Sequence, residues 1–131
     1  VRTEFASWEA TADRFKAAGS RLWVMVDQGT VIGSVGIVRQ PDGECELARM
    51  YVDASCRRKG YGRALFETAL AHARSLDSRR ISLATPSVNA PGMAFYASLG
   101  FVPVGSFRAE PAPGFEEKRV EISRLHLELR S

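Results

Sequence analysis

Four basic side chains lie within seven consecutive positions of the chain, together with two glycines. The basic residues are Arg57, Arg58, Lys59 and Arg63, and the glycines are Gly60 and Gly62. Apolar residues then recur every three to four positions, which predicts a helix whose first turn lies at the glycines. Backbone N–H groups at a helix start lack intrahelical acceptors, and glycine lets an anion approach them closely. The segment is therefore predicted to bind a phosphate or pyrophosphate group, while a glycine-containing loop with a solvated basic face is the alternative that so short a pattern leaves open.

Two common phosphate-binding loops do not fit the spacing of these residues. A Walker A loop needs a glycine, four residues and then Gly-Lys-Ser/Thr, whereas Lys59 here precedes Gly60. A dinucleotide-binding fingerprint would place its third glycine at Leu65. The strand expected before the glycines also belongs to a meander rather than to a βαβ unit. Both of these loop types are excluded.

The elements that must position this segment follow from hydrophobic periodicity and turn residues. The predicted order is helix, three strands, helix, strand, helix and two strands. The elements are a helix over 7–18, strands over 22–26, 31–38 and 44–52, a helix over 61–76, a short strand over 81–84, a helix over 91–99 capped by Asn89 or Ala90, a strand that begins at Phe101, and a strand over 120–129 after a loop at 110–117. The three early strands are predicted to form an antiparallel meander.

Length and composition predict one compact domain over residues 1–131, because the chain is 45% hydrophobic but too short for a second core. No apolar run approaches the roughly 20 residues of a membrane span, and the first residues lack the features of a signal peptide, so we expect a cytoplasmic protein without a membrane partner. Cys45 and Cys56 have no neighbouring His/Cys cluster and are interpreted as ordinary thiols, without a metal site. The net charge is only +3, without a broad basic face, so no nucleic-acid partner is expected.

Part of the chain closely resembles the signature of the GNAT superfamily of acyl-CoA-dependent N-acetyltransferases. A strand over 46–52 and a short loop lead to Arg57-Arg-Lys-Gly-Tyr-Gly62, which matches the family pattern Arg/Gln-x-x-Gly-x-Gly/Ala. A second block, in which Tyr96 lies seven residues after Asn89, resembles the second motif of the family. Together with the strand order, the two motifs extend the resemblance over about residues 22–129.

The resemblance implies an α+β fold with a mixed, mostly antiparallel sheet that is splayed in the middle and carries helices on both faces. The splay would separate the strand that ends at Val52 from the strand over 81–84, and it would admit the acyl-pantetheine arm of acetyl-CoA. Backbone groups of Met50 and Val52 would bind the thioester and the pantetheine. The cofactor-binding set implied in this way is Met50, Tyr51, Val52, Arg57, Arg58, Lys59, Gly60, Tyr61, Gly62, Arg63, Asn89 and Tyr96.

Glu46 matches the position of the general-base glutamate in the histone-acetylating members of the family. Strand alternation places it on the same face as Ala48, Met50 and Val52. A base is useful because a lysine-like amine with a pKa of about 10.4 is almost wholly protonated at neutral pH. The alternative is an edge-strand glutamate that faces water or binds an arginine such as Arg49.

Tyr96 matches the family's usual proton donor to the leaving thiolate of CoA, and Asn89 would both cap its helix and bind the pantetheine arm. The alternatives are a tyrosine packed in the core beside Phe95 and a pure helix cap. Neither histidine is assigned a role. We expect His72 to be solvated in the middle of its helix and His126 to face outward from its strand.

These implications predict an enzyme that moves an acetyl group from acetyl-CoA to a primary amine of a small molecule or a protein, by direct attack in a ternary complex, as a monomer or homodimer. The alternative is a non-catalytic acyl-CoA-binding or interaction module of the same fold. The family normally begins with a strand and a helix that wall one side of the acceptor site. This chain starts at Val1 and is predicted to enter its first helix almost directly, so we expect that N-terminal strand and helix to be missing.

Overall fold

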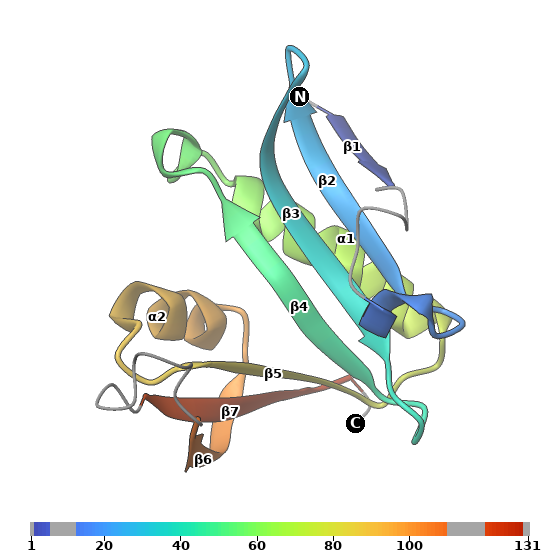
Figure 1. Cartoon of the computed structure of the whole chain (residues 1–131), viewed down its shortest axis with the longest axis vertical. Coiled ribbons are helices and arrows are strands. Elements are labelled where there is room, and N and C mark those ends of the chain that lie inside the picture. Colours follow the sequence, from blue (N-terminus) through green and yellow to red (C-terminus); the bar gives the residue numbers. More distant parts are fainter. Residues whose placement is uncertain (1, 6–12, 110–119, 130–131) are drawn as a thin grey trace. The chain divides into compact units, whose positions relative to one another are not determined.

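The computed structural model describes residues 2–5, 13–109 and 120–129 of the chain (Figure 1). The chain divides into two compact units, Val1–Ile81 and Ser82–Ser131. The boundary between them falls inside strand β5 (Arg80–Pro86). No helix in the described ranges has the length and apolar character needed to cross a membrane.

The observed elements largely coincide with those predicted. In chain order they are β1 (Arg2–Phe5), the 3₁₀-helix η2 (Asp13–Lys16), β2 (Arg21–Asp27), β3 (Thr30–Arg39), β4 (Cys45–Val52), the 3₁₀-helix η3 (Ala54–Cys56), α1 (Tyr61–Ser75), β5 (Arg80–Pro86), α2 (Ala90–Ser98), β6 (Val102–Arg108) and β7 (Glu121–Glu128). From β2 onward, every predicted strand and helix is confirmed to within two residues at its predicted ends. The loop predicted over 110–117 lies outside the described residues.

The N-terminal part differs from the prediction. Residues 2–5 form β1, which pairs antiparallel with β2, so an N-terminal strand is present where none was expected. The helix predicted over 7–18 lies partly outside the described residues, and its described part contains only the short helix η2. Four residues are too few to show the alternation of a strand, which is why periodicity alone does not reveal β1.

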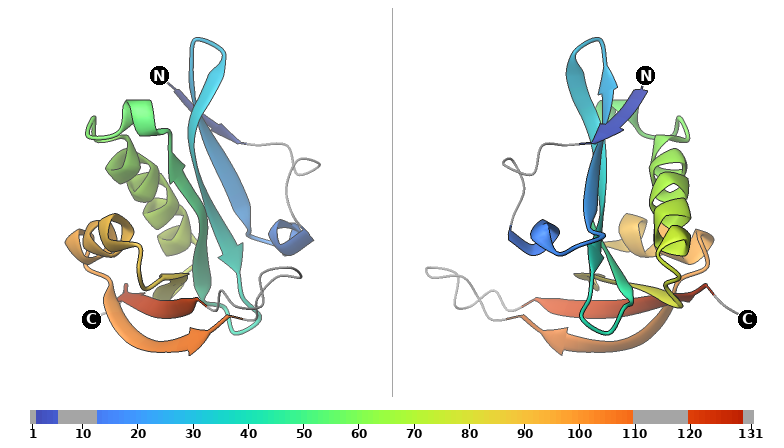
Figure 2. Two further views of the ribbon diagram at one scale, coloured as in Figure 1. Left: turned by 60° about the vertical axis from the view of Figure 1, so that its left-hand side comes forward. Right: turned by 90° about the vertical axis from the view of Figure 1, so that its right-hand side faces the viewer.

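In the first unit, β1 to β4 form an antiparallel sheet in chain order, with α1 on one face and η2 on the other (Figure 2). A Cβ atom at Gly33 would lie 3.0 Å from Leu65 Cδ1 of α1, whereas a Cβ at Gly36 would lie 2.7 Å from Phe15 Cζ of η2. Strand residues three apart point to opposite faces, which agrees with these contacts. The apolar stripe of α1 faces the sheet and buries Leu65, Phe66, Ala69 and Ala73.

A hydrogen bond and a ring contact join α1 to the start of β2. His72 Nε2 lies 2.7 Å from the backbone oxygen of Gly19, and the His72 ring meets the buried Trp23 ring edge-on with 5.2 Å between centroids. His72 is therefore half-buried and held by these two contacts, whereas a solvated side chain was predicted. Trp23 is a core anchor, as expected of a large aromatic side chain.

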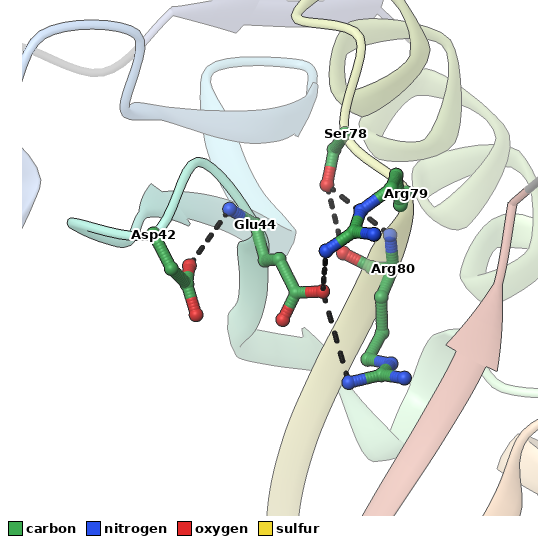
Figure 3. A network of polar contacts seen from close by, with 5 residues as sticks. All are labelled: Asp42, Glu44, Ser78, Arg79 and Arg80. Atoms are coloured by element: carbon green, nitrogen blue, oxygen red, sulfur yellow. Dashed lines mark hydrogen bonds and ion pairs between the residues drawn. The ribbon is translucent and has the colours of Figure 1, made fainter.

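A small polar network connects the turn before β4 to the entry of β5 (Figure 3). A carboxylate oxygen of Glu44 lies 3.9 Å from Arg79 Nη2 and 3.7 Å from Arg80 Nη1. The Asp42 carboxylate accepts a hydrogen bond of 2.9 Å from the Glu44 N–H, and the Ser78 hydroxyl donates one of 2.8 Å to Arg80 O. Because surface ion pairs contribute only about 0–1 kcal/mol, this network orients the two segments more than it stabilises them.

The second unit contains α2 and most of β5, with the strands in the order β5-β7-β6. Strands β6 and β7 pair antiparallel, Leu125 is buried, and the hydroxyls of Ser87 and Ser123 lie 2.7 Å apart. The pairings β1–β2, β2–β3, β3–β4 and β6–β7 are all antiparallel. The predicted α+β class with a mostly antiparallel sheet is confirmed.

Candidate active site

Strand β4 carries an irregularity that changes which way its residues point. Gly36 pairs with Ala48, but Ser34 pairs with Tyr51, so β4 holds one residue more than β3 over the same stretch. Such an extra residue is a β-bulge. Arg49, inside the bulge, has a φ of 56°, in the left-handed region that costs a residue with a side chain about 1–2 kcal/mol.

The bulge corrects the prediction that Glu46 and Val52 share one face of the strand. Side chains directly opposite each other in an antiparallel pair lie on the same face. Glu46 pairs with Val38, on the face that η2 covers, whereas Val52 pairs with Gly33, on the face of α1. Alternation predicts faces only in a regular strand, and no residue type in this segment indicates the extra residue.

A hydroxyl group from the neighbouring strand contacts the bulge. Ser34 Oγ donates a hydrogen bond of 2.6 Å to the backbone oxygen of Arg49. Sequence reasoning missed this contact because a serine within a strand of small and apolar residues shows no motif. The bond ties the irregular part of β4 to β3.

Glu46 is half-buried near the start of β4, on the face that η2 covers. Its Oε1 accepts a hydrogen bond of 3.1 Å from Gln40 Nε2. A carboxylate can accept about four hydrogen bonds, so a side chain oriented by an amide in this way can still accept a proton. The role of Glu46 as a general base stays a prediction.

One carboxylate organises the turn after β4. Asp53 accepts hydrogen bonds from the Ser55 hydroxyl, from the Ser55 N–H at 3.2 Å and from Tyr51 Oη at 3.2 Å. Its own N–H donates to Ile32 O at 2.7 Å, which anchors the turn to β3. The Ser55 hydroxyl and N–H, together with Tyr51, lower the pKa of Asp53, and the bond to Asp53 raises the pKa of Tyr51. These bonds fix the place where the basic loop begins.

The basic loop over 57–60 is exposed and has an unusual backbone. Arg58 has a φ of 65° and Gly60 a φ of 81°, so two of its four residues are left-handed. Arg57 Nε donates a hydrogen bond of 3.3 Å to Val52 O, which ties the loop back to the end of β4. The side chains predicted to bind phosphate, Arg57, Arg58, Lys59 and Arg63, are all exposed.

Helix α1 begins at Tyr61, as predicted, with Gly60 as its N-cap. No side chain in the described part of the chain caps this end, and the first N–H groups of any helix have no intrahelical acceptor. A Cβ atom at Gly60 would meet no atom within 4 Å, so the approach to this end is open. A pyrophosphate fits this combination of open N–H groups, positive helix end and exposed cations.

In the second unit, Asn89 caps α2, as predicted. Its Oδ1 accepts a hydrogen bond of 3.2 Å from the Gly92 N–H, and its Nδ2 lies 3.4 Å from Thr85 Oγ1. A Cβ atom at Gly92 would lie only 2.8 Å from Asn89 Cγ, so glycine at this position makes room for the cap. The contact of Asn89 with a pantetheine arm stays a prediction.

Tyr96 lies on α2, half-buried between two aromatic rings. Its ring centroid is 5.6 Å from that of Phe95 and 5.9 Å from that of Phe101. Within the described ranges, its hydroxyl has no hydrogen-bond partner. Burial raises the pKa of Tyr96 above its usual value of about 10, so the phenol stays protonated at neutral and moderately alkaline pH. Such a group is able to donate a proton.

The predicted site residues are divided between the two units. Those in the first unit are Glu46, Met50, Tyr51 and Val52 on β4, followed by Arg57, Arg58, Lys59, Gly60, Tyr61, Gly62 and Arg63 on the basic loop and the start of α1. Asn89 and Tyr96 lie at the start and in the middle of α2, in the second unit. The prediction did not include Ser34, Gln40 and Asp53, which contact these residues or the backbone beside them.

Comparison with known proteins matches residues 2–101 to the acetyltransferase (GNAT) family. N-acetylaspartate synthetase of Danio rerio is 34% identical over 131 residues, which are 99% of this chain and 45% of that protein. Human N-acetyltransferase 8 is 30% identical over 102 residues, which cover 74% of this chain and 45% of that protein. The chain thus spans less than half the length of these two relatives.

Solved structures of acetyltransferases share the fold. An IAA acetyltransferase from Bacillus cereus has a TM-score of 0.80 at 20% identity, covering 98% of this chain and 99% of its own. A putative phosphinothricin N-acetyltransferase has a TM-score of 0.75 at 26% identity, with 89% and 77% covered. A putative acetyltransferase from Salmonella typhimurium, solved with its cofactor acetyl-CoA, has a TM-score of 0.73 at 20% identity, with 86% and 66% covered. These similarities confirm the predicted fold.

The open start of α1 leads to a first prediction. Replacing Gly62 by valine puts a branched side chain beside the first N–H groups of the helix, so we expect CoA affinity to fall by about tenfold or more. The helix itself should persist, because valine is no worse than glycine in a helix. Titration calorimetry with CoA measures the effect. Ala71→Val, an exposed change on the same helix, is the matched control. Equal CoA affinity in both variants would show that CoA does not bind at this helix start.

Proposed function

This chain belongs to the acetyltransferase (GNAT) family, and we propose that it transfers an acetyl group from acetyl-CoA to a primary amine in a ternary complex. The observation that carries the proposal is the open, uncapped start of α1 behind a loop of exposed cations. The thioester of acetyl-CoA supplies an activated acyl group, and the pyrophosphate of the same molecule would bind at this helix end. Backbone groups of Met50, Tyr51 and Val52, together with Asn89, would hold the pantetheine arm.

Glu46 is proposed as the general base. Only about one lysine-like amine in a few thousand is neutral at pH 7, and only the neutral amine can attack a thioester. Glu46 sits half-buried on β4 with one oxygen held by Gln40, so its orientation is defined. We propose that it removes the proton directly or through one water molecule.

Tyr96 is proposed as the proton donor to the departing thiolate. The support is the half-buried side chain of Tyr96. Its hydroxyl has no hydrogen-bond partner within the described residues, and burial raises its pKa. A raised pKa keeps the Tyr96 phenol protonated at neutral and moderately alkaline pH. The proton needed as charge develops on sulfur is therefore available.

The acceptor is proposed to be a primary amine on a small molecule or a protein. Several relatives carry the name N-acetylaspartate synthetase, which makes the amino group of aspartate the first acceptor to test. The test is thiol release from acetyl-CoA with a panel of aspartate, other amino acids, polyamines and lysine peptides. We expect release that depends on one class of amine. CoA binding without release by any amine would instead support a non-catalytic acyl-CoA-binding module.

Removing the proposed base should slow only the step in which the acceptor amine loses its proton and attacks the thioester. We expect Glu46→Gln to lower kcat/KM for the amine by about 10²-fold near pH 7, because the amide cannot accept the proton. The deficit should shrink as pH rises, since solvent then deprotonates the amine. A pH–rate profile measures this, with Glu67→Gln on the exposed side of α1 as the matched control. Parallel profiles with a small offset would make Glu46 structural.

Removing the Tyr96 hydroxyl should lower turnover more than it weakens binding. We expect Tyr96→Phe to reduce kcat by about 10²-fold with little change in KM for acetyl-CoA, because a proton donor acts mainly in the transition state. Tyr51→Phe is the matched comparison, since its hydroxyl bonds to Asp53 in the turn and its loss should act mainly on KM. Steady-state kinetics from pH 7 to 9 separate the two effects, and turnover within about twofold of wild type would exclude Tyr96 as the donor.

A further inference from the structure

The side chain of Ser34 on β3 contacts the bulge of β4. The Ser34 hydroxyl reaches across from β3 and donates to Arg49 O at 2.6 Å. At that point Arg49 has a φ of 56° and the register of the two strands shifts. We propose that Ser34 is a positioning residue for acyl transfer, which acts by holding this bulge in place.

The bulge determines how the two ends of β4 are arranged within the first unit. Before the bulge, Glu46 points to the η2 face, and after it Val52 points to the α1 face. Residues six positions apart in a regular strand would point to the same face. If the bulge were lost, one end of β4 would have to turn over. Either Glu46 would leave its place beside Gln40, or the turn at Asp53 would lose its bond to Ile32 O.

A bulge of this kind needs a compensating contact. The left-handed backbone at Arg49 is unfavourable for a residue with a Cβ atom, and the extra residue leaves the regular ladder incomplete. The Ser34 hydroxyl supplies a bond of ordinary hydroxyl-to-oxygen length to the carbonyl of that residue. A glycine at position 49 would adopt the same φ without the penalty. Ser34 should therefore matter most while position 49 carries a side chain.

The inference rests on the proposed function, and its first test is kinetic. We expect Ser34→Ala to lower kcat about tenfold, because small displacements of reacting groups have effects of at least this size. Ser34→Thr keeps the hydroxyl and should stay within about twofold of wild type. Adenosine 3′-phosphate 5′-diphosphate should bind Ser34→Ala normally, because Asp53 and Arg57 hold the phosphate loop through separate bonds.

The matched control removes a similar bond elsewhere in the same unit. Ser75 Oγ donates a bond of the same 2.6 Å length to His72 O at the end of α1. Ser75→Ala should therefore leave kcat unchanged. An equal loss of kcat in Ser75→Ala and Ser34→Ala would mean that general destabilisation, and not the bulge, causes the effect.

A double-mutant cycle with Arg49→Gly decides the mechanism. In the Arg49→Gly background, Ser34→Ala should lower kcat by less than about threefold, so that the two changes are not additive. Equal losses in both backgrounds, a kcat for Ser34→Ala within twofold of wild type, or a Ser34→Thr variant no better than Ser34→Ala would each overturn the inference. If Ser34→Ala does not fold alone, rescue of folding by Arg49→Gly supports the inference and failure of rescue overturns it.

A readout that does not depend on activity separates this inference from the proposed function. Amide hydrogen exchange at residues 49–51 should speed up in Ser34→Ala and return to the wild-type rate in Ser34→Thr. Wild-type protein without thiol release would defeat the proposed function, while the exchange rates would still show whether Ser34 holds the bulge. Unchanged exchange in Ser34→Ala would overturn the inference even in an active enzyme.

Discussion

The arrangement of the first unit depends on strand β4, whose two ends direct their side chains to opposite faces of the sheet. The start of β4 must place Glu46 on the side that η2 covers, while its end must deliver the chain to the side where α1 packs. A regular strand of this length cannot do both, because its side chains alternate with a period of two. One extra residue at the bulge solves the problem. The extra residue requires a left-handed backbone at Arg49, which is unfavourable. The hydrogen bond from Ser34 to Arg49 O compensates for this penalty.

The start of α1 shows a second compromise between stability and ligand binding. A serine, aspartate or asparagine at the N-cap would bond to the first N–H groups and so occupy the donors that an anion needs. Gly60 leaves them open, and the loss in stability relative to a polar cap is only a few tenths of a kcal/mol. Burial of Leu65 and Phe66 one turn later contributes about 1.5–3 kcal/mol each, which more than offsets that loss.

Sequence patterns predicted the regular parts of this fold well. The apolar stripe of α1, the cap at Asn89 and the meander of β2 to β4 each depend on local residue types, and all three are confirmed. The prediction failed where geometry depends on contacts between distant residues. Neither the bulge at Arg49 nor the Gly19 contact of His72 has a local signal, because each forms with a segment at least 15 positions away. Strand β1 was missed because it is too short to show alternation.

The pairing of Asn89 with Gly92 constrains how this protein can change over generations. Alanine at position 92 would place a methyl group against the folded-back amide of Asn89, so the end of that side chain would have to shift to accept the substitution. Serine at 89, with a shorter side chain, would leave more room for the methyl group. The effect of a side chain at position 92 thus depends on the residue at position 89. Among descendants of a common ancestor, the two positions should consequently vary together.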